Sequence, residues 1–185
     1  RVSPSASKRS LGINVKTTEG LDIIHRLIAQ ADVVIENSQK GVMDAMGVGY
    51  EAMRAINPRI VMVSSQMLGS TGPWSDWMGY GPSTRPIGGM TYLWNHPDTE
   101  APTESSSIHT DNLAGRIGAV AGLATLLRRE RTGEGGHAEV AQVEAVVALL
   151  GDLLAQEDIR PGSVRPIGNV SPIAAPRGPS PCGGE

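Results

Sequence analysis

One acidic residue in this sequence stands where a carboxylate could act in catalysis: Asp111, in the segment HTDNLAG (residues 109–115). It directly precedes the longest helical pattern of the chain. One interpretation is an N-cap, in which the side chain accepts hydrogen bonds from the first backbone N–H groups of the helix. The other is a carboxylate nucleophile, because a helix N-terminus favours an anion and its free N–H groups stabilise charge developing on an acyl group. The two interpretations are compatible.

No other local pattern specifies a chemistry. The sequence has no G-x-G-x-x-G after a strand, no Walker loop and no nucleophile elbow around a serine. The four histidines lack the spacing of metal ligands, and the single cysteine, Cys182, excludes an internal disulfide and a cysteine-based zinc site. We therefore expect no metal centre, and a reducing compartment such as the cytosol fits the cysteine content.

The composition gives no support for nucleic acid or a membrane as the main binding partner. The chain has 185 residues and a formal net charge of −3, which gives no support for nucleic acid or an anionic membrane surface as the main partner. No apolar run approaches the roughly 20 residues that a membrane-spanning helix needs. The sequence opens with Arg1 and stops at Glu185 without a natural ending, so we expect a fragment.

Short strands and amphipathic helices are predicted to alternate along the chain. Strands are predicted where compact β-branched or alternating runs stand between polar residues: residues 11–15, 32–36, 59–65 and 137–141. Helices are predicted where apolar residues recur at helical spacing: residues 19–31 with Thr18 as N-cap, 42–46, 50–56, 112–131 and 142–156. This alternation predicts an α/β fold with a mainly parallel, open sheet.

The long helix predicted over residues 112–131 carries two kinds of residue. The apolar residues that share one stripe, and that we expect to be buried, are Leu113, Ile117, Val120, Ala124 and Leu127. The helix also contains three glycines, Gly115, Gly118 and Gly122. Each costs about 1 kcal/mol of helix stability against alanine. We expect such glycines where another backbone or a ligand comes close.

Two segments are predicted to lack regular structure. Residues 67–80 are rich in Gly, Ser, Thr and Trp and form a long loop, and loops of this length often serve a functional site. Six of the 13 prolines fall in the last 25 residues, so residues 157–185 are predicted to be an extended linker.

Several segments, in order along the chain, resemble the family III CoA-transferases, the group that includes formyl-CoA:oxalate and carnitine CoA-transferases. The segments that carry the resemblance are residues 8–17 (KRSLGINVKT), 31–37 (ADVVIEN), 46–51 (MGVGYE), 57–61 (NPRIV), 69–74 (GSTGPW), 128–135 (RRERTGEG) and 168–182. Each match is short, but the shared order and spacing make the set specific.

The resemblance implies a Rossmann-like large domain, a smaller domain, and two chains interlocked as rings in a homodimer. Residues 1–156 would form the central part of the large CoA-binding domain, with its open parallel sheet incomplete at both ends. Residues 157–185 would be a Pro/Gly-rich linker toward the small domain. The implied protein is cytoplasmic and holds no bound cofactor, because coenzyme A is a substrate.

The resemblance also assigns roles to residues. Asp111 matches the family's catalytic aspartate, which attacks an acyl-CoA thioester and passes CoA to a second carboxylic acid. CoA contacts are implied for Ile13, Asn14, Val15, Lys16, Asn37, Ser38 and Gln39. Tyr80, together with Trp77, could cover the pantetheine arm or could fill the core in a chain without Phe. By position, residues 88–94 would form part of the acyl pocket, and their Tyr and Trp indicate an acyl group bulkier than formate.

Two alternatives remain. The racemase branch of the family uses a His and an Asp in a "GHD" segment as a pair of bases. Tyr80 and Gly81 occupy those positions here, and a tyrosine with an ordinary pKa near 10 is a poor base at neutral pH. This difference favours a transferase. A non-catalytic protein that only binds CoA is the alternative from another class.

Overall fold

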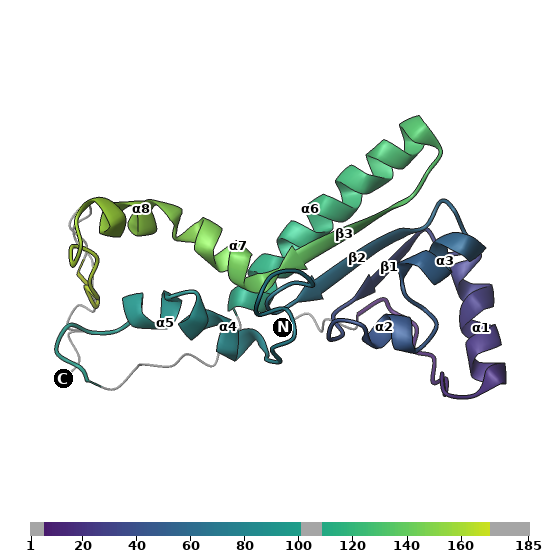
Figure 1. Ribbon diagram of the computed structural model, residues 1–185, viewed down its shortest axis with the longest axis horizontal. Coiled ribbons are helices and arrows are strands. Elements are labelled where there is room, and N and C mark those ends of the chain that lie inside the picture. The colour runs from purple at the N-terminus through teal and green to yellow at the C-terminus, as the bar shows by residue number, and fades with distance from the viewer. Residues whose placement is uncertain (1–5, 101–108, 171–185) are drawn as a thin grey trace, which may run out of the picture.

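The computed structural model describes residues 6–100 and 109–170 (Figure 1). Its strands are β1 (Val33–Glu36), β2 (Val61–Gln66) and β3 (Gly136–Ala141). Its helices are α1 (Thr18–Ile28), α2 (Val42–Ala45), α3 (Tyr50–Ile56), α4 (Gly81–Ile87), α5 (Met90–Leu93), α6 (His109–Thr132), α7 (Gln142–Leu149) and α8 (Gly151–Ile159).

The three strands form one parallel sheet in the order β1-β2-β3. Val33 on β1 pairs with Val61 on β2, which pairs with Gly136 on β3, so the three strands begin at the same level of the sheet. The predicted α/β fold with an open parallel sheet is confirmed. Because parallel strands all end at the same edge, the loops that follow β1, β2 and β3 meet at one side of the molecule.

Helices α1 and α3 cover one face of the sheet. The buried residues of this core are Ile28, Val48, Met53, Ile60 and Met62. Helix α1 begins one residue earlier than predicted, because the hydroxyl of Thr17 accepts the backbone N–H of Gly20 at 3.1 Å and caps the helix. Asn57 holds the other end of α1 by donating to the carbonyls of Ile28 and Ala31.

Helix α6 covers the opposite face through its small residues. A Cβ placed on Gly118 or Gly122 would lie 3.3 or 3.1 Å from the side chain of Val63, so the glycines allow the helix to lie close to β2. The predicted buried stripe is wrong: Val120 and Leu127 are each 67% exposed. The reason is geometric, since a helix approaches a sheet most closely along its smallest side chains, and the larger apolar side chains then point away.

Arg129 fastens the far end of α6 to the sheet. Its guanidinium donates to the carbonyl of Arg59 at 3.2 Å and pairs with Asp32 Oδ1 at 3.1 Å. The Arg129 side chain is only 10% exposed, and these contacts, together with Glu130 Oε1 at 3.8 Å, compensate its burial. The helix is therefore tied to the segments that enter both β1 and β2.

Helices α4, α5, α7 and α8 extend from the sheet as an arm (Figure 1). Helices α4 and α5 occupy a segment for which no helix was predicted. The single helix predicted over residues 142–156 is divided at Leu150, and its second half, α8, continues to Ile159, beyond the expected start of the linker.

The strand predicted at residues 11–15 does not form. The chain instead turns ahead of α1, where the carbonyl of Asn14 accepts both the backbone N–H and the hydroxyl of Thr17. None of the described helices is long and apolar enough to cross a membrane.

Candidate active site

A cavity of about 630 Å³ lies beyond the carboxyl ends of the three strands. The strand ends contribute residues 37–40 after β1, residues 65–69 at the end of β2, and Gln142 after β3. The loop before α4 and the starts of α4 and α6 contribute Ser75, Trp77, Met78, Gly79, Tyr80, Gly81, Ser83 and Asp111. Ligands of open parallel sheets bind at this edge, so the cavity is the candidate site.

Asp111 lines the cavity from the first turn of α6. The helix begins at His109, so Asp111 lies inside it, and the N-cap interpretation of this residue is wrong. A Cβ at position 81 would lie 2.5 to 2.6 Å from the two carboxylate oxygens of Asp111, which therefore pack directly against Gly81. The buried hydroxyl of Thr110 donates to the carbonyl of Gly81 at 3.0 Å and fixes this contact.

The turn after β1 carries Lys40, a positively charged side chain that lines the cavity. The backbone N–H of Ser38 donates to Glu36 Oε2 at 2.6 Å, which holds the turn at the end of the strand. The ammonium of Lys40 then donates to Ser75 Oγ at 2.9 Å and to Asp76 Oδ1 at 3.2 Å. Lys40 thus connects the end of β1 to the loop between β2 and α4.

A second contact holds the same loop from the other side. Glu139, on β3, accepts the backbone N–H of Ser70 at 2.6 Å and also the Ser70 hydroxyl. Gly69 makes the preceding turn with a φ of +76°, which favours glycine. Glu139 was not predicted from the sequence, because nothing local to β3 indicates that the loop after β2 lies beside it.

Two glutamines add neutral polar groups that the sequence analysis also missed. Gln142 begins α7, and its side-chain oxygen accepts the hydroxyl of Thr84 at 3.2 Å. Gln66 ends β2, and its side-chain oxygen is buried without a hydrogen-bond partner in the described part of the chain. Polar residues at consecutive strand ends are the signal that could have found them.

The structure brings one part of the predicted site together. The predicted residues that line the cavity are Asn37, Ser38, Gln39, Tyr80 and Asp111. Four predicted CoA-contact residues, Ile13, Asn14, Val15 and Lys16, lie in the turn before α1 and do not line it. Residues 88–94, expected in the acyl pocket, are also absent from its lining, because α5 extends into the arm.

The arrangement suits attack by a carboxylate. Among the described lining residues the ionisable side chains are Lys40, Tyr80 and Asp111, and none is a histidine that could activate one of the serines as a nucleophile. Residues 6–100 and 109–170 contain no group of three His, Cys, Asp or Glu side chains that could hold a metal ion. Asp111 is therefore the side chain best placed for nucleophilic or acid–base chemistry.

Comparisons with known proteins agree on one family. The family model described as CoA-transferase family III matches residues 2–184. Probable CoA-transferase Rv1866 of Mycobacterium tuberculosis is 34% identical over 182 residues, which are 95% of this chain and 23% of that protein. Succinyl-CoA–D-citramalate CoA-transferase of Chloroflexus aurantiacus is 32% identical over 171 residues, which are 92% of this chain and 42% of that protein.

The fold is shared with solved structures as well. A crystal structure of a CAIB/BAIF family protein from Brucella suis aligns with a TM-score of 0.84 and 34% identity, over 91% of this chain and 44% of that one. The chain thus spans less than half of the length of each of these three relatives.

Proposed function

The chain belongs to CoA-transferase family III, and we propose that the full-length protein moves CoA between an acyl-CoA thioester and a free carboxylic acid, with Asp111 as the covalent nucleophile. The observation that carries the proposal is the position of Asp111, whose carboxylate lines the cavity at the strand ends and packs against Gly81.

The proposed exchange takes place in four steps at the Asp111 carboxylate. The Asp111 carboxylate attacks the thioester carbonyl and releases CoA thiolate, which leaves a mixed anhydride. The thiolate attacks the aspartyl carbonyl, releases the first acid and forms an aspartyl-CoA thioester. The second acid attacks that thioester to give a new mixed anhydride, and the thiolate then takes the new acyl group and frees Asp111. The covalent route replaces one difficult exchange with easier steps.

The geometry at Gly81 supports transfer over racemisation. The matching segment of the racemase branch has an Asp where this chain has Gly81, and a side chain at position 81 would force the carboxylate of Asp111 to move. Tyr80, in the position of the racemase base, has a side chain 82% exposed to solvent. Among the described residues that line the cavity there is therefore one carboxylate that can act as a nucleophile and no pair of bases.

CoA would enter beside the turn after β1. Asn37, Ser38 and Gln39 line the cavity there, and the ammonium of Lys40 lies next to them. We assign these residues to CoA binding and carry over Ile13, Asn14, Val15 and Lys16 from the family resemblance alone. The interlocked homodimer, the cytoplasmic location, the absence of a bound cofactor and the assignment of residues 1–156 to a large domain and 157–185 to a linker are likewise parts of this proposal.

The test is chemical trapping on the full-length protein. Candidate acyl-CoA donors are added with hydroxylamine, which converts an activated aspartyl group into a hydroxamate, and the modified peptide is identified by mass spectrometry. We expect modification of Asp111 and loss of CoA transfer in Asp111→Asn. Asp152→Asn is the matched control, since Asp152 also lies in the first turn of a helix but does not line the cavity. CoA binding without exchange would favour the non-catalytic alternative.

A further inference from the structure

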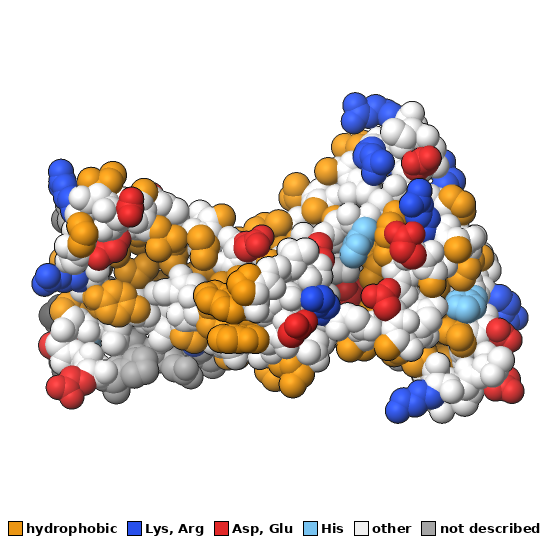
Figure 2. Space-filling model, viewed as in Figure 1, with side chains coloured by type: hydrophobic (Ala, Val, Ile, Leu, Met, Phe, Trp, Pro, Cys, Tyr) orange, Lys and Arg blue, Asp and Glu red, His pale blue; other side chains and the backbone are white. Residues whose placement is uncertain are grey.

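The loop between β2 and α4 exposes an unusual share of the chain's aromatic side chains. The chain has three Trp, three Tyr and no Phe, and this loop holds Trp74, Trp77 and Tyr80. Trp74 and Trp77 are stacked, with ring centroids 5.7 Å apart and planes 22° apart, and they are 50% and 59% exposed. Figure 2 shows hydrophobic side chains gathered on the middle of the visible face, where this loop lies in Figure 1. Exposed apolar patches of this kind mark binding surfaces.

Part of this loop lies in the same cavity as the proposed nucleophile. Trp77, Met78 and Tyr80 line the same cavity as Asp111. Tyr80 directly precedes Gly81, against which the carboxylate of Asp111 packs. An acyl group held on Asp111 would therefore share the cavity with these apolar and aromatic side chains.

The charges of the cavity disfavour a second carboxylate on the acyl group. Lys40 is the only Lys or Arg among the described residues that line the cavity, and its ammonium already donates to Ser75 and pairs with Asp76. A distal carboxylate would enter the cavity that holds the carboxylate of Asp111, without a free cation among the described lining residues to pair with. Sites that recognise carboxylates usually supply a bidentate arginine for this purpose.

We propose that the acyl groups handled by this site are bulky, apolar and monocarboxylic, with an aromatic ring that stacks on Trp77. This inference rests on the proposed function and specifies its substrate class. The reaction steps are unchanged, because the ring binds beside the reacting carbonyl and takes no part in bond making. Stacking adds to the gain from burying apolar area, and it orients the thioester toward Asp111.

The experiment measures isotope exchange between an acyl-CoA and its own labelled acid, catalysed by the full-length protein. The pairs are 3-phenylpropionyl-CoA, butanoyl-CoA and succinyl-CoA, each with its own free acid, so no acceptor has to be known. We expect kcat/KM to be about tenfold higher for the phenylpropionyl pair than for the succinyl pair. In Trp77→Ala, kcat/KM for the phenylpropionyl pair should fall about 3- to 10-fold, with the butanoyl pair within about twofold of wild type.

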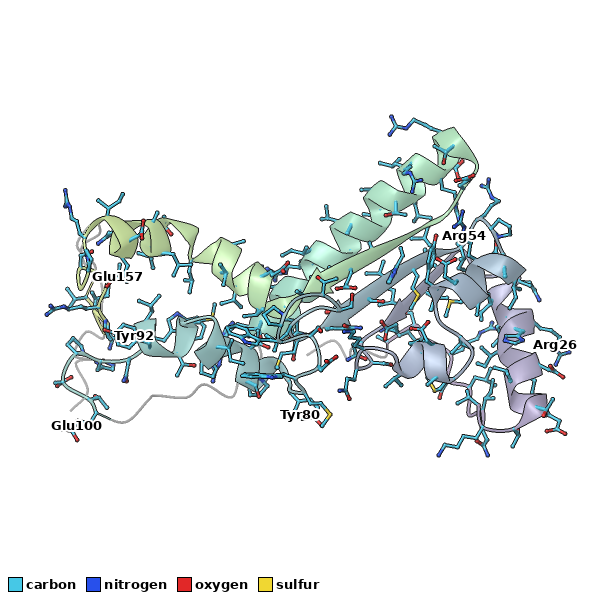
Figure 3. All side chains as sticks on the ribbon, in the orientation of Figure 1. Arg26, Arg54, Tyr80, Tyr92, Glu100 and Glu157 are labelled. Carbon is cyan, nitrogen blue, oxygen red and sulfur yellow. The ribbon has the colours of Figure 1, made fainter. Side chains whose placement is uncertain are left out.

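Ile159→Ala is the matched control. Ile159 is 76% exposed at the end of α8, does not line the cavity, and belongs to the same helix as Glu157, which lies well along the arm from Tyr80 in Figure 3. Its kcat/KM values should equal those of the wild type. Trp77→Leu keeps an apolar side chain without the ring, and thermal unfolding of each variant confirms that the fold is intact.

The outcomes separate the two proposals. A preference for succinyl-CoA, or an equal loss for all three pairs in Trp77→Ala, overturns the aromatic acyl assignment and leaves CoA transfer standing. A loss that appears with CoA thioesters but not with acyl-pantetheine also overturns it, because the ring would then hold the adenine base. No exchange with any pair overturns the proposed function together with this inference.

Discussion

The carboxylate of Asp111 packs against the α-carbon of Gly81, although Gly81 begins α4 and Asp111 lies in the first turn of α6. Thr110 holds the same pair of segments together through its hydrogen bond to the Gly81 carbonyl. A side chain at position 81 would force this carboxylate to move, so the orientation of the proposed nucleophile depends on a glycine that takes no part in the chemistry.

Gly81→Ala is therefore expected to displace the carboxylate of Asp111 and to lower kcat about 100-fold, because a misplacement of about 1 Å in an active site has that order of effect. The backbone of Gly81 is not in the left-handed region, so the added methyl group is the only disturbance. Steady-state transfer assays on the full-length protein measure the effect. Wild-type kcat in Gly81→Ala would show that the packing against Gly81 is not needed.

Substitutions at two glycines of α6 should change the free energy of unfolding in opposite directions, because the surroundings of these glycines differ. A Cβ at Gly122 would lie 3.1 Å from Val63, whereas one at Gly115 would meet nothing within 4 Å. Gly122→Val should lower the free energy of unfolding by about 1–3 kcal/mol through overpacking. Gly115→Ala should raise it by up to about 1 kcal/mol through helix propensity. Urea unfolding monitored by circular dichroism checks both, and equal effects would contradict the close approach of α6 to β2.

Asp76 is expected to compete with the phosphates of CoA for Lys40. The pair is 3.2 Å apart, and the Asp76 side chain is 86% exposed, so the ion pair is weak and easily exchanged. Asp76→Asn should strengthen CoA binding about 2- to 5-fold, and Lys40→Gln should weaken it by about as much or more. Calorimetric titrations with CoA and with pantetheine measure this. Equal changes for pantetheine, which lacks the nucleotide phosphates, would contradict the mechanism.

Glu139 should govern the order of the loop between β2 and α4. Its carboxylate accepts both the backbone N–H and the hydroxyl of Ser70, so Glu139→Ala removes two hydrogen bonds at once. The loop carries exposed Trp and Tyr residues, which are chymotrypsin sites, and we expect cleavage there to become several-fold faster. Glu134→Ala, in the exposed turn before β3, is the control. Unchanged cleavage in Glu139→Ala would show that the loop is held by other contacts.

The pKa of Glu157 lies below its ordinary value of 4.5, because its carboxylate accepts the backbone N–H groups of Gly162 and Val164. The hydrogen bonds are 2.5 and 2.9 Å long. Since the folded pKa is depressed, this stabilisation is present above about pH 4.5 and is lost as the pH falls through the folded pKa.

Amide NMR shifts of Gly162 and Val164 should therefore titrate with a midpoint below 4.5, and Glu157→Gln should abolish the titration. A midpoint at or above 4.5 would contradict these hydrogen bonds.

Much of the fold follows from local patterns. The helix predicted at residues 50–56 is α3 in the structure, and the predicted strands at 32–36, 59–65 and 137–141 agree with β1, β2 and β3 to within one or two residues. These elements were predictable because β-branched runs and helical periodicity act over a few neighbouring residues. Asn37, Ser38, Gln39, Tyr80 and Asp111 could be selected in the same way, from short motifs at strand and helix ends.

The remaining features depend on which distant segments meet. No local rule indicates that α6 buries its glycines and exposes Val120 and Leu127, because that choice is made by the distance to Val63 on another strand. The sequence by itself determined the parallel α/β framework and the acidic residue at the head of its longest helix. Only the tertiary structure decided that the carboxylate packs against Gly81. It also decided that Glu139 and Lys40 bind the loop between β2 and α4 beside the cavity. These contacts join residues that are far apart in the chain, so no local pattern indicates them.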